Sequence, residues 1–269
     1  MSKKRSHPLL SLHSLLMMLF MYVPILTVIV YSFNNTKLSG DWKGFTLDWY
    51  VSLFQNRHVM EALWNSLFIA LVSTVAATLL GTLAALAMRH ISRRWKGGLG
   101  GLLYLPVIVP DIIMGLSLLV LFTQFNLSLG KTTVIIAHIT FSLSYVYVVV
   151  TARLSGMGGQ LEEAAQDLGA SGWQTFRYVT LPQITPGIIS GALIAFTLSL
   201  DDFMVSFFVA GPSSTTLPIY IYGQVKRGIS PEINALCTLL IIVSVTLILL
   251  SQYVLNRGKG QKKHKMLPI

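Results

Sequence analysis

Three carboxylates lie inside long apolar stretches of this sequence, namely Asp111, Asp201 and Asp202. An ionised carboxylate can bind a cation or relay a proton. At membrane depth such groups are costly, so they usually face a polar pathway. No Lys or Arg lies in the middle of any of these stretches, so we expect the acids to have no partner in this chain. Unpaired acids suit a cationic substrate.

Each acid also has a structural interpretation. Asp111 follows Pro110, with Pro106 shortly before it, so it could cap a helix that restarts after a kink, and for this residue both interpretations stay open. Asp201 and Asp202 are adjacent and would point about 100° apart on a helix. One of them could pair with a basic residue of a partner chain or stay protonated. We favour the pathway role for Asp201 or Asp202.

Catalytic and metal-binding chemistry is not expected. His58, His90 and His138 are scattered without the spacing of a metal site, and the sequence contains no nucleophile motif. We expect His138 to be a hydrogen-bonding residue in helix packing. The single cysteine, Cys237, is expected to act as a small buried apolar residue.

The composition is that of a membrane protein. The chain is 53% apolar and 11% charged, with a mean hydropathy of +0.66, which leaves too few charges to cover a soluble globule. The net charge of +10 does not indicate nucleic acid binding, because the basic residues lie between apolar runs and are not gathered on one surface.

The elements that must position these acids are membrane-spanning helices. Crossing a bilayer takes about 20 apolar residues. Six stretches meet this length, at roughly 9–31, 62–88, 99–125, 132–152, 184–209 and 233–255. The first is longer than the core of a signal peptide and no small-residue cleavage site follows it, so we interpret it as an anchor. The sequence therefore predicts an all-α polytopic membrane protein with a single transmembrane domain over residues 1–269.

The positive residues indicate the orientation. If the N-terminus is inside, 14 of the 20 Lys and Arg residues fall in cytoplasmic pieces, including the basic ends at 3–5 and 257–265. Lys and Arg near span ends stay on the cytoplasmic side, so both termini are predicted to lie there. The basic C-terminal tail then lies near anionic lipid.

A cytoplasmic loop, residues 153–183, separates the fourth and fifth predicted spans. Strong helix formers over 161–168 predict a short helix, and Gly169 follows where a left-handed cap is favoured. Ser171 with Gln174 predicts a capping box that begins a second helix, and Leu181-Pro182 is predicted to end it. The loop is expected to be an ordered helical elbow.

The elbow resembles the EAA motif of ABC importer permeases, in which it is the coupling helix that docks on the ATPase. The match consists of Glu163-Ala164-Ala165, then Gly169, then Val179-Thr180-Leu181-Pro182, with Val179 where the motif usually has isoleucine. The resemblance implies the ABC importer type I permease fold, and contact with the ATPase through Glu163, Ala164, Ala165, Gly169, Leu181 and Pro182. It also implies ATP and Mg²⁺ on partner ATPase subunits and no cofactor in this chain. Gly130-Lys131-Thr132 resembles the end of a phosphate loop, but Phe125 stands where that loop needs its first glycine.

A narrower resemblance is to the polyamine permease subunits of such importers. It is carried by residues 196–202 (Phe-Thr-Leu-Ser-Leu-Asp-Asp), 206–212 and 230–236, and by Pro110-Asp111-Ile112. It implies a spermidine/putrescine importer of the bacterial inner membrane, with this chain as the second of two paired permeases. The other parts would be the homologous permease, two ATPase copies and an extracytoplasmic polyamine-binding protein. The outer loops 32–61 and 210–232 would meet that protein, with Glu232, Asp41 and Asp48 near the entrance.

Two other functions are considered beside this one. An importer of the same class could carry ferric iron, thiamine or another solute. A secondary transporter could use Asp201 as a proton relay, although the elbow argues against it. Trp42, Trp49 and Tyr50 form an interfacial aromatic belt or, alternatively, a cation-binding face.

Overall fold

The computed structural model describes residues 8–36, 41–228, 230–243 and 245–246. Within these ranges the chain forms helices, with an isolated bridge between Asn34 and Phe45 and no strand. The all-α prediction is therefore confirmed for the part of the chain that the structure describes. The chain divides into two compact units, residues 1–57 with 221–269 (the terminal unit) and residues 58–220 (the central unit).

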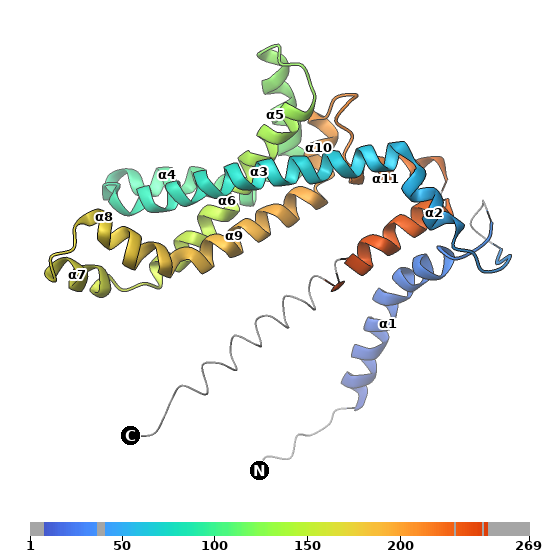
Figure 1. The fold of residues 1–269 in the computed structure, drawn as a ribbon, viewed down its shortest axis with the longest axis horizontal. Coiled ribbons are helices and arrows are strands. Elements are labelled where there is room, and N and C mark those ends of the chain that lie inside the picture. The colour runs from blue at the N-terminus through green and yellow to red at the C-terminus, as the bar shows by residue number, and fades with distance from the viewer. Residues whose placement is uncertain (1–7, 37–40, 229, 244, 247–269) are drawn as a thin grey trace. The chain divides into compact units, whose positions relative to one another are not determined.

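The terminal unit begins with helix α1 (Pro8–Tyr31), drawn in blue in Figure 1. It coincides with the first predicted span and is apolar on all sides, and its side chains are largely exposed within this chain. A helix that is apolar all round needs lipid or another protein around it. The basic residues 3–5, which support the predicted orientation, lie outside the described residues.

An ordered loop connects α1 to the short helix α2 (Asp48–Gln55). The Asn34 side chain donates to the Asp41 carbonyl at 2.8 Å and accepts from the Lys43 N–H at 2.9 Å. The Trp49 indole donates to the Asn34 carbonyl, and the Tyr50 hydroxyl lies 2.7 Å from the Ser32 hydroxyl. Trp49 and Tyr50 thus stabilise the loop itself, which supports a structural role for two of the three aromatic residues.

The last described helix of the terminal unit is Pro231–Val243. It follows α11 (Leu217–Arg227) in the chain and covers the first half of the predicted sixth span, 233–255. Residues 247–255 of that span, and the basic tail 257–265, lie outside the described residues. Cys237 is partly buried in this helix.

The central unit contains the long helices α3 (Arg57–His90), α4 (Arg93–Ile108), α6 (Lys131–Ser155) and α9 (Leu181–Asp201). They run alongside one another in Figure 1, with α6 packed against both α4 and α9. Glycines bring the helices close: a Cβ on Gly191 would lie 3.3 Å from the Val146 Cα, and one on Gly81 would lie 2.8 Å from the Leu143 carbonyl oxygen. Gly187 allows a similar approach to the Arg153 side chain, where a Cβ would lie 3.0 Å from the Arg153 Cβ.

The predicted third span, 99–125, is wrong as one continuous helix. It consists of α4 and α5 (Asp111–Gln124), which are bent by 108° at the break. Val109 and Pro110 at the break adopt extended backbone angles, and Pro110 disfavours the helical conformation at the residue before it. A helix therefore restarts at Asp111 as predicted, but Pro110 holds the cap position and no capping hydrogen bond from the Asp111 side chain is found among the described residues.

The predicted fifth span, 184–209, is also wrong at its end. Helix α9 ends at Asp201, and a separate short helix, α10 (Met204–Val209), follows. Helix α10 packs against α5 so closely that a Cβ on Gly115 would lie 2.9 Å from the Phe208 ring. The two breaks thus place α5 and α10 together.

Within the described residues, four helices are long and apolar enough to cross a membrane, or five if the bent α4–α5 pair counts as one span. They are α1, α3, α6 and the continuous helix Gly172–Asp201. The predicted number of six is not confirmed, because the sixth stretch continues beyond the described residues.

Candidate functional site

The predicted elbow, residues 153–183, contains an ordered pair of short helices, as expected. Helix α7 (Gln160–Asp167) has Leu168 as its C-cap, and Gly169 follows with a φ of +88°, the left-handed conformation that glycine adopts at least cost. Ser171 then forms a capping box with Gln174: each side chain bonds the other's backbone N–H, at 3.4 and 2.8 Å. This capping box begins helix α8 (Gly172–Thr175).

The second helix does not stop at Pro182. It continues through a π-helical turn, η1 (Phe176–Thr180), into α9, so the predicted break at Leu181-Pro182 is wrong. A proline inside an α-helix loses one hydrogen bond and clashes with the carbonyl four residues earlier. The wider π turn that precedes Pro182 spaces these carbonyls differently, which allows the helix to continue into the predicted span.

A salt bridge ties the elbow to the end of α3. Arg89 donates from both terminal nitrogens to the two carboxylate oxygens of Glu162, at 2.9 and 2.7 Å. Thr180 of η1 donates its hydroxyl to the same carboxylate at 2.6 Å. Hydrogen bonds, first from Arg89 and then from Thr180, lower the pKa of Glu162 to about 2 against the opposing effect of burial. The carboxylate is therefore ionised at neutral pH.

Sequence reasoning missed Arg89, Glu162 and Thr180. The available signal was that two acids, Glu162 and Glu163, are adjacent, since neighbouring residues of a helix point in different directions and the two need different surroundings. Glu162 points back to α3, whereas Glu163 is exposed.

The predicted coupling residues lie on the elbow with different exposures. Glu163, Ala164, Gly169 and Pro182 are exposed, and Ala165 and Leu181 are half-buried. Large apolar side chains are also exposed on the same segment: Leu161, Leu168, Trp173 and Tyr178. Leu168, beside the left-handed turn, is 90% exposed, so the elbow presents a hydrophobic surface next to an acid.

A second constellation is buried in the central unit where α6, α9 and α10 meet. His138 of α6 is fully buried, and its Nδ1 lies 2.6 Å from the Ser199 hydroxyl. Its Nε2 lies 2.9 Å from the Ser206 hydroxyl and 3.3 Å from the Asp202 carboxylate. Ser199 also lies 3.1 Å from the Ser73 hydroxyl of α3. We refer to Ser73, His138, Ser199, Asp202 and Ser206 as the polar cluster.

The expectation that the membrane acids have no partner in this chain is wrong for Asp202. Besides His138, its carboxylate accepts from the N–H groups of Val205 and Ser206, at 3.2 and 2.7 Å, and from the Ser206 hydroxyl at 2.7 Å. Its side chain is 8% exposed. Asp202 also lies beyond the end of α9 with an extended backbone, so it does not share a helix with Asp201.

The other predicted acids lie apart from this cluster. Asp201 is the last residue of α9 and is exposed, and no hydrogen bond or ion pair to its carboxylate is found among the described residues. Asp111 is exposed in the first turn of α5, where an acid suits the helix dipole. In the terminal unit, Glu232 accepts a hydrogen bond of 2.8 Å from the Asn56 side chain.

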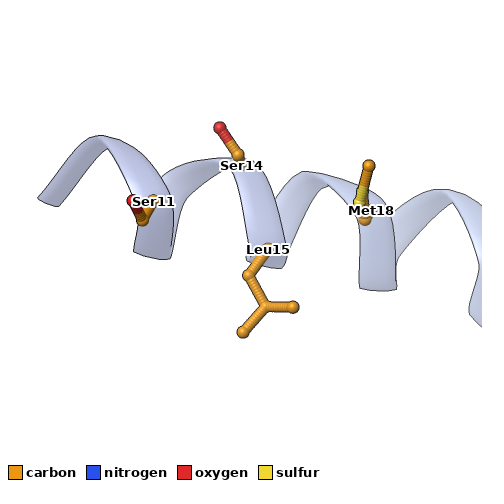
Figure 2. A pocket seen from close by; sticks show the side chains of 4 residues that line it. All are labelled: Ser11, Ser14, Leu15 and Met18. Carbon is orange, nitrogen blue, oxygen red and sulfur yellow. The ribbon is translucent and has the colours of Figure 1, made fainter. Parts of the chain in front are cut away.

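No metal site is found among the described residues, since no cluster of three possible ligands occurs there. A surface hollow on α1 is lined by Ser11, Ser14, Leu15 and Met18 (Figure 2). These four side chains come from adjacent turns of one exposed helix, so the hollow has no opposing wall and offers no enclosed site.

Comparison with known proteins decides the family. Residues 77–261 match the family described as "Binding-protein-dependent transport system inner membrane component". The chain belongs to this family. The matched region contains the elbow and every residue of the polar cluster except Ser73, so the two constellations are parts of an inner-membrane permease.

Individual relatives of this permease have closely related names. The spermidine/putrescine transport system permease protein PotC of Escherichia coli K12 is 42% identical over 90% of this chain and 92% of its own. The putrescine transport system permease protein PotI of the same strain is 41% identical over 90% and 89%. Both alignments extend well beyond the elbow, over most of the permease.

Solved structures show the fold. Two crystal structures of a bacterial ABC transporter that imports the acidic polysaccharide alginate match with TM-scores of 0.72 and 0.70, at 20% and 19% identity. They cover 92% and 93% of this chain, and 94% and 93% of theirs. The second contains a periplasmic protein loaded with an alginate pentasaccharide. The permease therefore has the fold of ABC importer permeases.

Proposed function

We propose that this permease passes polyamine cations, spermidine and putrescine, across the bacterial inner membrane as one subunit of an ABC importer. The observation that carries the proposal is the exposed Asp201 carboxylate at the end of α9, in a chain whose relatives are named for these cargoes.

Asp201 has the electrostatics of a cation site. It lies at the C-terminal end of a helix, where unpaired carbonyl groups make the potential negative and an added acid is unfavourable unless a cation is nearby. Met204 and Phe207, on the short helix that follows, are 43% and 50% exposed. A polyamine alternates ammonium groups with methylene segments, which matches a carboxylate beside apolar and aromatic side chains.

The other acids have weaker claims on the cargo. Asp111 remains a pathway candidate because it is exposed at a helix break. Glu232 is a candidate at the entrance, and its bond to Asn56 leaves one carboxylate oxygen available. The Asp202 carboxylate accepts hydrogen bonds from α10 and lies against His138, so it is less available to bind the cargo than Asp201.

The elbow would transmit the action of the ATPase. Its exposed residues Glu163, Ala164 and Gly169 would dock in a groove of a partner ATPase, with Glu163 pairing a basic residue there, and Ala165, Leu181 and Pro182 would support that contact. ATP and Mg²⁺ would be held by two ATPase copies, so this chain would need no cofactor and no catalytic residue. ATP-driven closure of these subunits would push on the elbow, and hydrolysis would reset the permease pair.

The remaining organisation is proposed from the charge and hydropathy of the sequence. The permease would have six spans with both termini in the cytoplasm. It would pair with a homologous permease, and its outer loops 32–61 and 210–232 would receive cargo from an extracytoplasmic polyamine-binding protein.

The test is ATP-dependent uptake of labelled spermidine and putrescine in cells that lack other polyamine systems. Uptake should require this chain and fall at least about tenfold in Asp201→Asn, since an unpaired charge at membrane depth is strongly coupled to its cation. Asp201→Glu, which keeps the negative charge at this position, is the matched control and should retain most of the uptake. If no polyamine enters with the full set of partners present, the cargo is wrong. Uptake driven by an ion gradient without ATP would indicate a secondary transporter.

A further inference from the structure

The two adjacent acids at the end of α9 have opposite surroundings. Both oxygens of Asp202 accept hydrogen bonds from the first turn of α10, and its side chain is nearly buried. Asp201, one residue earlier, is exposed. Something in the fold must hold one carboxylate inward at the point where the helix stops.

His138 is the residue in a position to do so. It lies on α6, is fully buried, and has one ring nitrogen against Ser199 of α9 and the other against Ser206 of α10 and the Asp202 carboxylate. A single imidazole therefore links three helices at the break. Ser199 extends the connection to Ser73 on α3, whose hydroxyl also lies 2.7 Å from the Ile69 carbonyl.

The link lies at the break between α9 and α10. Residues 196–209 are apolar apart from the serines, the threonine and the two aspartates, a composition that would allow α9 to continue as one helix. The Asp202 carboxylate instead satisfies the free N–H groups at the start of α10, and His138 holds the carboxylate there. Without the imidazole, a nearly buried carboxylate would lack its ring partner, which is costly in a site closed to water.

We propose that His138 is a positioning residue of the cargo pathway. Through Ser199 and Asp202 it fixes the break between α9 and α10, so that of these two adjacent acids Asp202 stabilises the fold and Asp201 faces the cargo. The cargo part of this inference rests on the function proposed above; the positioning part does not.

The test measures the exposure of position 201 directly. In a chain with Cys237→Ser, which removes the single cysteine, Asp201→Cys supplies one thiol at the end of α9. The intact importer in membranes is treated with a cationic methanethiosulfonate reagent, and the labelling rate of that thiol is compared with and without changes in the polar cluster.

We expect the labelling rate to fall at least about fivefold when His138→Phe or Asp202→Asn is added. Each change removes one partner of a buried hydrogen bond, and the free energy of such a bond corresponds to a change in rate of about this size. His138→Gln keeps a donor near Asp202 and should stay within about twofold of the parent. Thr140→Val is the matched control on α6. Among the described residues the Thr140 hydroxyl bonds the Ile136 carbonyl of its own helix and no residue of the polar cluster, so the rate should also stay within about twofold.

An unchanged labelling rate in both His138→Phe and Asp202→Asn overturns the proposal. If His138→Phe does not accumulate in the membrane, Ser199→Ala is measured in its place, because it removes only the hydroxyl that His138 contacts on α9. An unchanged labelling rate in Ser199→Ala would also overturn the proposal. Polyamine uptake in the same cells, measured with Asp201 intact, tests the proposed cargo separately from the positioning role of His138. Altered labelling together with absent polyamine uptake by the parent would keep the positioning role and reject the cargo.

Discussion

Arg89, the penultimate residue of α3, donates two hydrogen bonds to the Glu162 carboxylate of α7, and Thr180 of η1 donates a third to the same carboxylate. The bridge makes one connected unit of the end of a long helix and the elbow. A force applied to α7 therefore reaches α3 directly as well as α9 through the chain.

Reversing the charge of Arg89 should uncouple the elbow from α3. In Arg89→Glu, two acids would face each other, and ATP-dependent uptake should fall at least about fivefold, the lower end of ordinary coupling between sites. Uptake should recover in the double variant Arg89→Glu with Glu162→Arg. The measurement is uptake alongside ATPase activity of the assembled importer.

The control for this pair is Arg93→Glu, at an exposed arginine of α4 for which no ion pair is found among the described residues. Its uptake should stay close to that of the parent. Equal losses in Arg93→Glu and Arg89→Glu, or no recovery in the double variant, would argue against the bridge as the coupling element.

The contribution of Glu162 to stability should depend on acid pH. Its pKa in the folded chain, about 2, lies below the ordinary value of 4.5, so its stabilising effect is complete above pH 4.5 and is lost as the pH falls through about 2. The difference in unfolding temperature between the parent and Glu162→Gln should therefore be constant from pH 8 to about pH 5 and drop to roughly half or less by pH 3. Thermal unfolding in detergent measures it. A difference that grew on acidification would contradict the assigned ionisation.

Gly169 should tolerate only residues that adopt a left-handed backbone. A Cβ there would meet nothing within 4 Å, so any defect comes from the φ of +88° and not from crowding. Gly169→Val should cost about 1–2 kcal/mol of local stability and reduce uptake, whereas Gly169→Asn should keep most of it. Equal uptake by the two variants would mean that the left-handed turn is unimportant for coupling.

Gly81 should resist even an added methyl group. A Cβ there would lie 2.8 Å from both the Leu143 carbonyl oxygen and the Val146 Cβ, so α3 and α6 would have to separate. Gly81→Ala should lower the free energy of unfolding by about 1–3 kcal/mol. Gly101→Ala, in α4 with open space around it, should leave stability unchanged or raise it by about 0.5–1 kcal/mol. Thermal unfolding of both in the same detergent decides whether close packing is the cause.

Local rules predicted the elbow well. Gly169 and the Ser171–Gln174 capping box are set by residues a few positions apart, and both occur as expected. Pro182 was misjudged, because the rule that proline stops a helix assumes regular α-helical turns, and the π turn before it changes the spacing.

The membrane acids were harder to predict, because their surroundings are made by distant segments. The composition of 184–209 is that of a continuous span, and the break at Asp202 requires His138, which lies on another helix. A histidine in the middle of an apolar stretch was the available signal, since such a residue must find a polar partner. The sequence could not show which acid would contact His138, because that depends on how the helices pack.

The elbow also bears on how a partner is recognised. Its capping box, left-handed turn and bridge to Arg89 all form within the isolated chain, so the loop holds its shape before any partner arrives. An unstructured segment would lose about 1–2 kcal/mol of chain entropy for each residue ordered on contact. Docking on this loop avoids that loss, so even a small contact surface can bind tightly enough to stay attached through repeated cycles.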